Sequence, residues 1–203
     1  MELSKVTMIL RGYNVEQVRT VAEVLLHSKY VRNMEITLNT DNAYEIIRTI
    51  SDEYQDKLNI GAGTVQTYDE LKKAVDAGAK FVLSPRQMTA DMLAYCKERG
   101  IVSVPGSFTP SEIGDQFAMG ADIVKIFPAN ELSLKYAKKV CEPMGNLKLM
   151  AVGGINRGNV REALDSGYKY VGTAGGLFPK EQILQMDKEK MLISLKEFEA
   201  ELD

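Results

Sequence analysis

One lysine interrupts an otherwise apolar stretch, DIVKIFPA, over residues 122–129. Val124 and Ile126, on either side of Lys125, are typical of a buried β-strand. Burying an ammonium group without a partner is costly, so its presence there needs an explanation. An amine in an apolar site has a lowered pKa and can attack a carbonyl carbon to form an imine. Lys125 is therefore a candidate nucleophile.

The carboxyl of Glu35, in the stretch MEITLN over residues 34–39, is a second candidate group. Side chains alternate along a strand, so the apolar members of this stretch face one side. The polar members, Glu35, Thr37 and Asn39, face the other. In a barrel the apolar set would pack against helices and the polar set would line the interior, where Lys125 also points.

Two interpretations of this acid and amine remain open. By the same alternation, Lys125 faces inward together with Ile123 and Phe127. The pair with Glu35 could be a buried ion pair with a structural role alone, although such pairs stabilise a fold only weakly. It could instead combine a nucleophilic amine with an acid–base carboxyl, because perturbed ionisable groups cluster at active sites.

The elements that must position these groups repeat along the chain. Apolar runs alternate with helical segments, and they begin near Val6, Met34, Asn59, Lys80, Ile101, Asp122, Lys148 and Lys169. This repeat of βαβ units predicts a parallel sheet, and eight units predict one compact (β/α)8 TIM barrel over residues 1–203. A doubly wound sheet is the alternative, but no GxGxxG follows the first run. Residues 187–203 are expected to form a terminal helix.

Composition narrows the chemistry. The net charge of -3 provides no overall basic field for nucleic acid. No apolar run approaches the length of a membrane span and the start is not a signal peptide, so we expect a cytoplasmic protein without membrane contact. His27, Cys96 and Cys141 do not supply the usual zinc ligands or a histidine-based triad. We therefore expect no metal and no cofactor.

Chemistry in such a barrel occurs at the C-terminal ends of the strands. Several expected strand ends have unusual residues: GAGT at 61–64, SPR at 84–86, PGSFT at 105–109, FPA at 127–129, VGGIN at 152–156 and GTAGG at 172–176.

The motifs EITLNT, GAGTV, VKIFPA, VGGI and GTAGG, in this order, resemble the 2-keto-3-deoxy-6-phosphogluconate (KDPG) aldolases. That family includes the 4-hydroxy-2-oxoglutarate (KHG) aldolases and the 6-phosphogalactonate enzymes. The resemblance covers nearly the whole chain. It implies a Schiff-base (class I) aldolase on a (β/α)8 barrel, commonly a homotrimer. Such an enzyme cleaves a small 2-keto-4-hydroxy acid to pyruvate and an aldehyde, either glyceraldehyde 3-phosphate or glyoxylate.

The resemblance also implies residue roles. It gives the imine to Lys125, the acid–base role to Glu35, and substrate binding to Thr64 and Arg11. It implies a backbone cup for phosphate, formed by Gly153, Gly154, Ala174 and Gly175. From the residues alone, Thr64 could equally be an ordinary strand-end residue and Arg11 a solvated loop cation. The glycines could simply be turn residues.

Three positions depart from the family pattern. Many KDPG aldolases have arginine where this chain has Asn39, although the 6-phosphogalactonate branch also has asparagine. A serine often found near Gly175 is missing, and Arg86 stands where a small or polar residue is usual. We expect Arg11 first, and Arg86 second, to bind the substrate carboxylate beside Asn39. We also expect phosphate to be accepted but less strongly required, which predicts broad use of 2-keto-4-hydroxy acids.

Other hypotheses remain open at this stage. The chain could be specific for the 6-phosphogalactonate substrate. It could be a phosphate-binding barrel of the isomerase or synthase class, with Lys125 as an electrostatic residue, or a binder of sugar-acid phosphates without catalytic activity. Trapping of an imine separates the aldolase from the last two.

Overall fold

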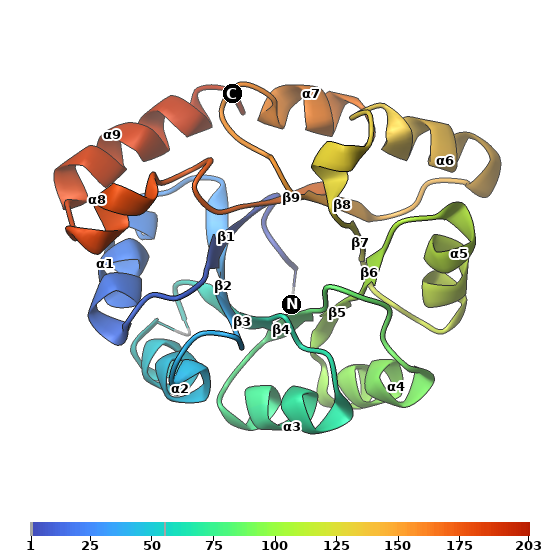
Figure 1. Cartoon of the computed structure of the whole chain (residues 1–203), viewed down its shortest axis with the longest axis horizontal. Helices are drawn as coiled ribbons and strands as arrows, with labels where there is room; N and C mark the ends of the chain where they lie inside the picture. The colour runs from blue at the N-terminus through green and yellow to red at the C-terminus, as the bar shows by residue number, and fades with distance from the viewer. Residues whose placement is uncertain (1, 55) are drawn as a thin grey trace.

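The computed structural model describes residues 2–54 and 56–203. Strands and helices alternate along the chain, and the strands form a central ring inside a ring of helices (Figure 1). The strands are β1 (Val6–Leu10), β2 (Val31–Thr37), β3 (Asn59–Gly63), β4 (Phe81–Leu83), β5 (Val102–Val104), β6 (Gly106–Ser107), β7 (Val124–Ile126), β8 (Leu149–Val152) and β9 (Tyr170–Thr173). The helices are α1 (Val15–Leu25), α2 (Ala43–Tyr54), α3 (Tyr68–Asp76), α4 (Ala90–Arg99), α5 (Pro110–Ala118), the 3₁₀ turn η1 (Ala129–Glu131), α6 (Tyr136–Met144), α7 (Val160–Asp165), α8 (Lys180–Leu184) and α9 (Lys188–Glu199).

The sheet is a (β/α)8 barrel in which one strand is broken. Its strand order is β5-β4-β3-β2-β1-β9-β8-β7-β6, and all pairings are parallel. β5 and β6 lie at the two ends of this order and are separated only by Pro105, which has no N–H to donate to a ladder. They are two pieces of one strand, so the ring closes. This confirms the barrel and excludes the doubly wound sheet.

Apolar side chains fill two layers of the barrel. The outer layer lies between strands and helices and contains Val124 and Ile126 of β7. The inner layer lies within the ring and contains Ile123, with Phe127 packed against it. The alternation predicted for β7 is therefore confirmed, and Lys125, between Val124 and Ile126, faces the interior.

The bottom of the barrel is closed by the segment before β1. Leu3 is buried in the inner apolar layer. Next to it the fully buried Asn33 side chain donates through Nδ2 to the backbone oxygens of Ser4 at 2.9 Å and Val6 at 3.2 Å. Asn33 Oδ1 accepts from Asn59 Nδ2 at 2.9 Å and from the Ser4 backbone N–H at 3.2 Å. An extended segment thus closes the end of the barrel opposite the strand C-termini.

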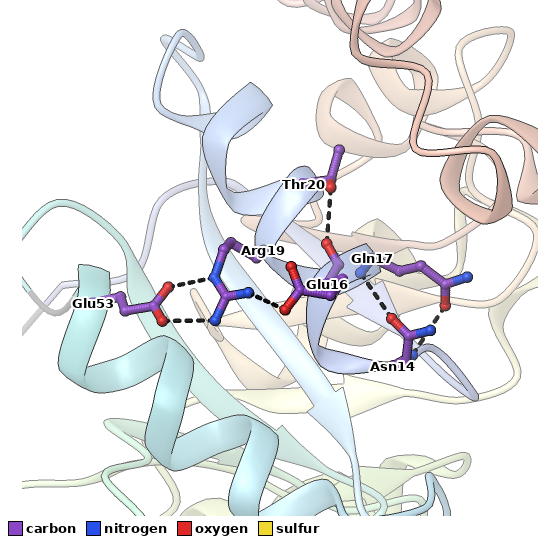
Figure 2. A network of polar contacts seen from close by, with 6 residues as sticks. All are labelled: Asn14, Glu16, Gln17, Arg19, Thr20 and Glu53. Atoms are coloured by element: carbon purple, nitrogen blue, oxygen red, sulfur yellow. Dashed lines mark hydrogen bonds and ion pairs between the residues drawn. The ribbon is translucent and has the colours of Figure 1, made fainter.

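Side chains fix the start of several helices and join them. α1 begins with a capping box in which Asn14 and Gln17 each accept a backbone N–H of the other (Figure 2). Arg19 of α1 donates two hydrogen bonds of 2.8 Å to Glu53 of α2, and also pairs with Glu16. These contacts hold together the two helices that follow β1 and β2.

The terminal helix expected over residues 187–203 forms, but it ends earlier, at Glu199. α9 covers Lys188–Glu199, with Met191, Leu195 and Phe198 buried and Leu192 partly buried against the core. In the described part of the chain, no helix is both long and apolar enough to span a membrane.

Candidate active site

Lys125 lies in the middle of β7 and is 4% exposed. Its Nζ lies 5.0 Å from the centre of the Phe127 ring. Burial lowers the pKa of Lys125, the carboxyl of Glu35 opposes this effect and the nearby Arg11 adds to it, and the net result is a pKa of about 8. Near neutral pH, a larger fraction of this amine is therefore unprotonated than of an ordinary lysine, and the unprotonated form is the one that attacks a carbonyl.

Glu35 projects from β2 into the same interior and is 3% exposed. Burial raises the pKa of this carboxyl, and the charges of Lys125 and Arg11 lower it in part. Its Oε2 has no hydrogen-bond partner among the described residues, and Glu35 does not take part in any of their ion pairs. The amine and the acid therefore affect each other electrostatically without forming a closed salt bridge.

The neighbouring strand makes room for the Glu35 carboxyl. A Cβ built on Gly63 of β3 would lie 1.6 Å from Glu35 Oε1, so only glycine fits at this position. The next residue, Thr64, is partly buried and has a φ of 60°. This left-handed conformation is strained for a β-branched residue, and such strain is concentrated at functional sites. The GAGT motif thus ends in a backbone turn beside the carboxyl.

The glycine motifs after β8 and β9 line one cavity of about 490 Å³. The structure brings together here five of the residues named from the sequence: Arg11, Gly153, Gly154, Ala174 and Gly175. The cavity also reaches Ile9, which belongs to the apolar layer inside the ring. Arg11 is exposed at the end of β1 and is close enough to affect the pKa of both buried ionisable groups. The glycine cavity and the buried amine therefore lie at the same mouth of the barrel.

Gly153 and Gly154 of the glycine motif after β8 precede α7, which begins only at Val160. They lie in a loop with positive φ values of 114° and 71°. Since these conformations favour glycine, the loop adopts a path that other residues would resist.

Asparagines that the sequence analysis did not single out hold this loop. The backbone oxygen of Gly154 accepts hydrogen bonds from Asn156 Nδ2 at 3.0 Å and Asn159 Nδ2 at 2.9 Å. Asn130 packs against the glycines from η1, and its Oδ1 would lie 2.7 Å from a Cβ on Gly153. The sequence signal was the clustering of asparagine and glycine in the stretch at 153–159, which is typical of loops with side-chain to backbone bonds.

Two other residues named from the sequence lie apart from this cavity. Asn39 is exposed in a turn after β2. The strand ends at Thr37, so alternation no longer fixes the direction of the Asn39 side chain. Arg86 follows β4 and lines a second cavity of about 240 Å³, which Phe127 also lines.

Thiol chemistry is not supported by the cysteines. Cys96 is buried in α4, and burial raises the pKa of its thiol to about 12. Cys141 lies in α6. Among the described residues, no three histidine, cysteine, aspartate or glutamate side chains gather in a way that could hold a metal ion. The ionisable groups that converge inside the barrel are therefore Lys125 and Glu35.

Comparison with known proteins identifies the family. The model of the KDPG and KHG aldolases matches residues 1–193. The chain belongs to the KDPG and KHG aldolase family. Membership makes it an aldolase, which is a carbon–carbon lyase, and confirms the resemblance read from the motifs.

Relatives within this aldolase family include a probable 2-dehydro-3-deoxy-6-phosphogalactonate aldolase from Rhizobium meliloti (strain 1021). It is 30% identical over 171 residues, which cover 84% of this chain and 80% of the relative. The 2-dehydro-3-deoxy-phosphogluconate aldolase of Treponema pallidum (strain Nichols) is 32% identical over 163 residues, covering 80% and 76% of the two chains. Relatives of similar distance thus bear both substrate names.

Solved structures of aldolases share the fold. The KDPG aldolase from Legionella pneumophila, with pyruvate captured as a covalent carbinolamine intermediate, has a TM-score of 0.83 and 27% identity. The alignment covers 97% of this chain and 93% of that one. A native KDPGal structure has a TM-score of 0.86 at 24% identity, covering 100% and 98%, and supports the fold alone.

Proposed function

We propose that this aldolase forms an imine between Lys125 and a 2-keto-4-hydroxy acid and cleaves it to pyruvate and an aldehyde. The observation that carries the proposal is the buried amine of Lys125, with a pKa lowered to about 8, facing a buried carboxyl in one barrel mouth. The captured carbinolamine of the Legionella relative supports the same covalent chemistry.

The reaction follows from these two groups. Nζ of Lys125 attacks the C2 carbonyl and water leaves, which gives a protonated imine. Glu35 takes the proton of the C4 hydroxyl, directly or through water, and the C3–C4 bond breaks. Its electron pair moves to the imine, which becomes an enamine, and the aldehyde departs. Glu35 then returns a proton to C3, and water hydrolyses the imine to release pyruvate and the free amine.

A raised pKa suits Glu35 to this double role, because a carboxyl that titrates nearer to neutral pH can both accept and return a proton. Acid–base help of this kind is typically worth about 10²- to 10⁴-fold in rate.

The far end of the substrate binds at the glycine cavity in this proposal. Arg11 and the loops of Gly153, Gly154, Ala174 and Gly175 line it. A guanidinium together with unobstructed backbone suits a phosphate or a carboxylate. Thr64, which directly follows the Gly63 that adjoins the Glu35 carboxyl, offers a hydroxyl to the keto-acid end.

The substrates we propose are KDPG, its galactonate epimer and unphosphorylated 4-hydroxy-2-oxoglutarate. Both sugar-acid phosphates appear in the names of relatives at similar identity. Steady-state kinetics on the three compounds, with coupled detection of pyruvate, tests this breadth. Strict dependence on a phosphorylated substrate would refute it.

We further propose that residues 1–203 form a single domain that acts as a cytoplasmic homotrimer, in keeping with the family. Light scattering coupled to size-exclusion chromatography measures the oligomer, and fractionation of the source cells measures the location.

Borohydride trapping with pyruvate tests the imine. The wild-type chain should gain one reduced three-carbon adduct, mapped by peptide mass spectrometry to Lys125, and Lys125→Met should abolish it. Lys139→Met is the matched control, because Lys139 is exposed on α6 and, among the residues that the structure describes, pairs with Glu142 alone. An adduct on another lysine, or none, would overturn the proposal.

A further inference from the structure

A second cavity opens at the same rim as the glycine cavity. It has a volume of about 240 Å³ and is lined by residues that follow β4, β6 and β7: Pro85, Arg86, Gln87, Gly106, Ser107, Phe108, Glu112 and Phe127. The glycine cavity is lined from β8, β9 and β1. β7 lies between β6 and β8 in the ring (Figure 1). The two cavities therefore flank the strand that holds Lys125.

This second cavity adjoins the reactive amine. Its wall includes Phe127, whose ring centre lies 5.0 Å from Lys125 Nζ. Gly106, another wall residue, is the register partner of Lys125 across the β6–β7 pair. A small group bonded to the imine carbon could therefore extend from Lys125 into this cavity.

Arg86 is a cation without a partner in this cavity. Its side chain forms neither a hydrogen bond nor an ion pair with any residue that the structure describes. The carboxylate of the same wall, Glu112, is already engaged, since its Oε2 accepts from the backbone N–H groups of Phe108 at 2.7 Å and Thr109 at 2.8 Å. The guanidinium is thus free to bind an anion from outside the chain.

The backbone of Arg86 is fixed next to the site. Its N–H donates to Ser84 Oγ at 3.2 Å, and its carbonyl oxygen accepts from the Gly106 N–H at 2.9 Å. Gly106 packs so tightly on Pro85 that an added Cβ would lie 2.7 Å from the carbonyl carbon and oxygen of Pro85. Although the Arg86 side chain is exposed, its backbone is therefore held against β6, the strand that pairs with the Lys125 strand β7.

We propose that Arg86 binds the carboxylate that adjoins the reacting carbonyl of the substrate. This inference rests on the proposed imine at Lys125. A 2-keto acid with a distal phosphate or carboxylate is charged at both ends. Arg11 and the glycine cavity receive the distal end, so the carboxylate on the imine carbon needs a cation on the other side of β7. Arg86 supplies it, and it makes the site select 2-keto acids over neutral ketones.

Trapping at graded ligand concentrations tests this role. Wild type, Arg86→Ala and Arg86→Lys are reduced with borohydride in pyruvate and, separately, in methyl pyruvate, which lacks the negative charge. Arg86→Ala should raise the pyruvate concentration that gives half-maximal labelling of Lys125 by about tenfold. This factor lies near the lower limit of what a charge-assisted hydrogen bond contributes to binding, because the guanidinium is exposed. Arg86→Lys should recover part of this, and labelling by methyl pyruvate should be unchanged in both variants.

Arg48→Ala is the matched control, because Arg48 is exposed on α2 and lies in neither cavity. Equal weakening of both ligands in Arg86→Ala would mean a general distortion and would overturn the carboxylate role, as would unchanged pyruvate labelling. If pyruvate labelling were weakened in Arg11→Ala but not in Arg86→Ala, the carboxylate would be assigned to Arg11 instead. If wild type itself forms no adduct, the proposed aldolase chemistry fails, an outcome distinct from failure at Arg86 alone.

Discussion

Lys125 has the properties of a reactive amine because its charged form is poorly solvated. The ring of Phe127 and the inner apolar layer surround it, and the Glu35 carboxyl restores only part of what burial removes. The protonated amine is therefore less favoured inside the barrel than it would be in water.

The pH dependence of labelling follows from this. The pKa of Lys125 is lowered to about 8, so the unprotonated fraction should fall about tenfold for each pH unit below that value and level off above it. The initial rate of borohydride-trapped labelling, measured by mass spectrometry across this range, should follow the same curve. A rate that continued to climb towards the ordinary lysine pKa of about 10.4 would contradict the lowered value.

The lowered pKa of Lys125 also makes the stability of the fold depend on pH. Between the folded pKa of about 8 and the higher unfolded value, the unfolded chain binds more protons at this residue. The contribution of Lys125 to the free energy of unfolding therefore rises with pH through this window.

Glu35→Gln removes the acid–base group while keeping its shape. The imine with pyruvate should still form, but exchange of the pyruvate methyl protons with solvent and cleavage of substrate should slow by about 10²- to 10⁴-fold. Proton NMR of the methyl group measures the exchange. If exchange and turnover were both unchanged, Glu35 would be only an electrostatic neighbour of Lys125.

Gly63→Ala tests the same carboxyl by displacement, because the new Cβ would occupy the place of Glu35 Oε1. It should slow exchange as well. Gly114→Ala in α5 is its control, since a Cβ there meets only the terminal methyl of Met144, at 3.2 Å.

At the scale of elements, the carboxyl end of α9 is tied to the turn between α1 and β2. Glu199 Oε1 accepts from Ser28 Oγ at 2.6 Å and from the backbone N–H groups of Lys29 and Tyr30, each at 2.9 Å. One carboxylate thus satisfies three donors of a segment far away in the sequence.

Glu199→Ala should lower the free energy of unfolding by about 1–3 kcal/mol, because it leaves these donors without their acceptor. Urea unfolding followed by circular dichroism measures the change. Glu197→Ala on the same helix removes only a surface pair with Arg157 and should cost less than about 1 kcal/mol. Equal losses in the two variants would show that the tie adds nothing.

Local sequence patterns predicted most of these elements but missed two features. Alternation along a strand depends on nearest neighbours, so it correctly predicted that Lys125 and Glu35 face the interior. The break at Pro105 and the path of the loop after β8 were not predicted. The break follows from the missing N–H of proline, which was not used in placing the strand ends. The loop depends on contacts between distant segments, such as Asn130 against Gly153, which have no signature in a single stretch of sequence.

At the scale of the molecule, the Asn33 network links the segment before β1 to β1, β2 and β3. Asn33→Leu should lower the free energy of unfolding by about 2–4 kcal/mol, because it leaves buried backbone oxygens and the Asn59 amide without partners. If residues 1–203 form one domain, unfolding should remain a single transition. The substitution lies below the proposed site, so kcat of the surviving folded protein should stay near the wild-type value. Two separate transitions would contradict the single domain.

The closed bottom of the barrel also sets the route by which products leave. Leu3 and Asn33 fill the end opposite the strand C-termini, so both fragments depart past the rim where the substrate entered. In the proposed reaction, the aldehyde is freed while the three-carbon fragment is still bonded to Lys125, and pyruvate is freed only when water hydrolyses that bond. Pyruvate is then the last product on the enzyme and competes with substrate for the free amine. Accumulating pyruvate would therefore slow the enzyme by occupying the residue that starts the next turnover.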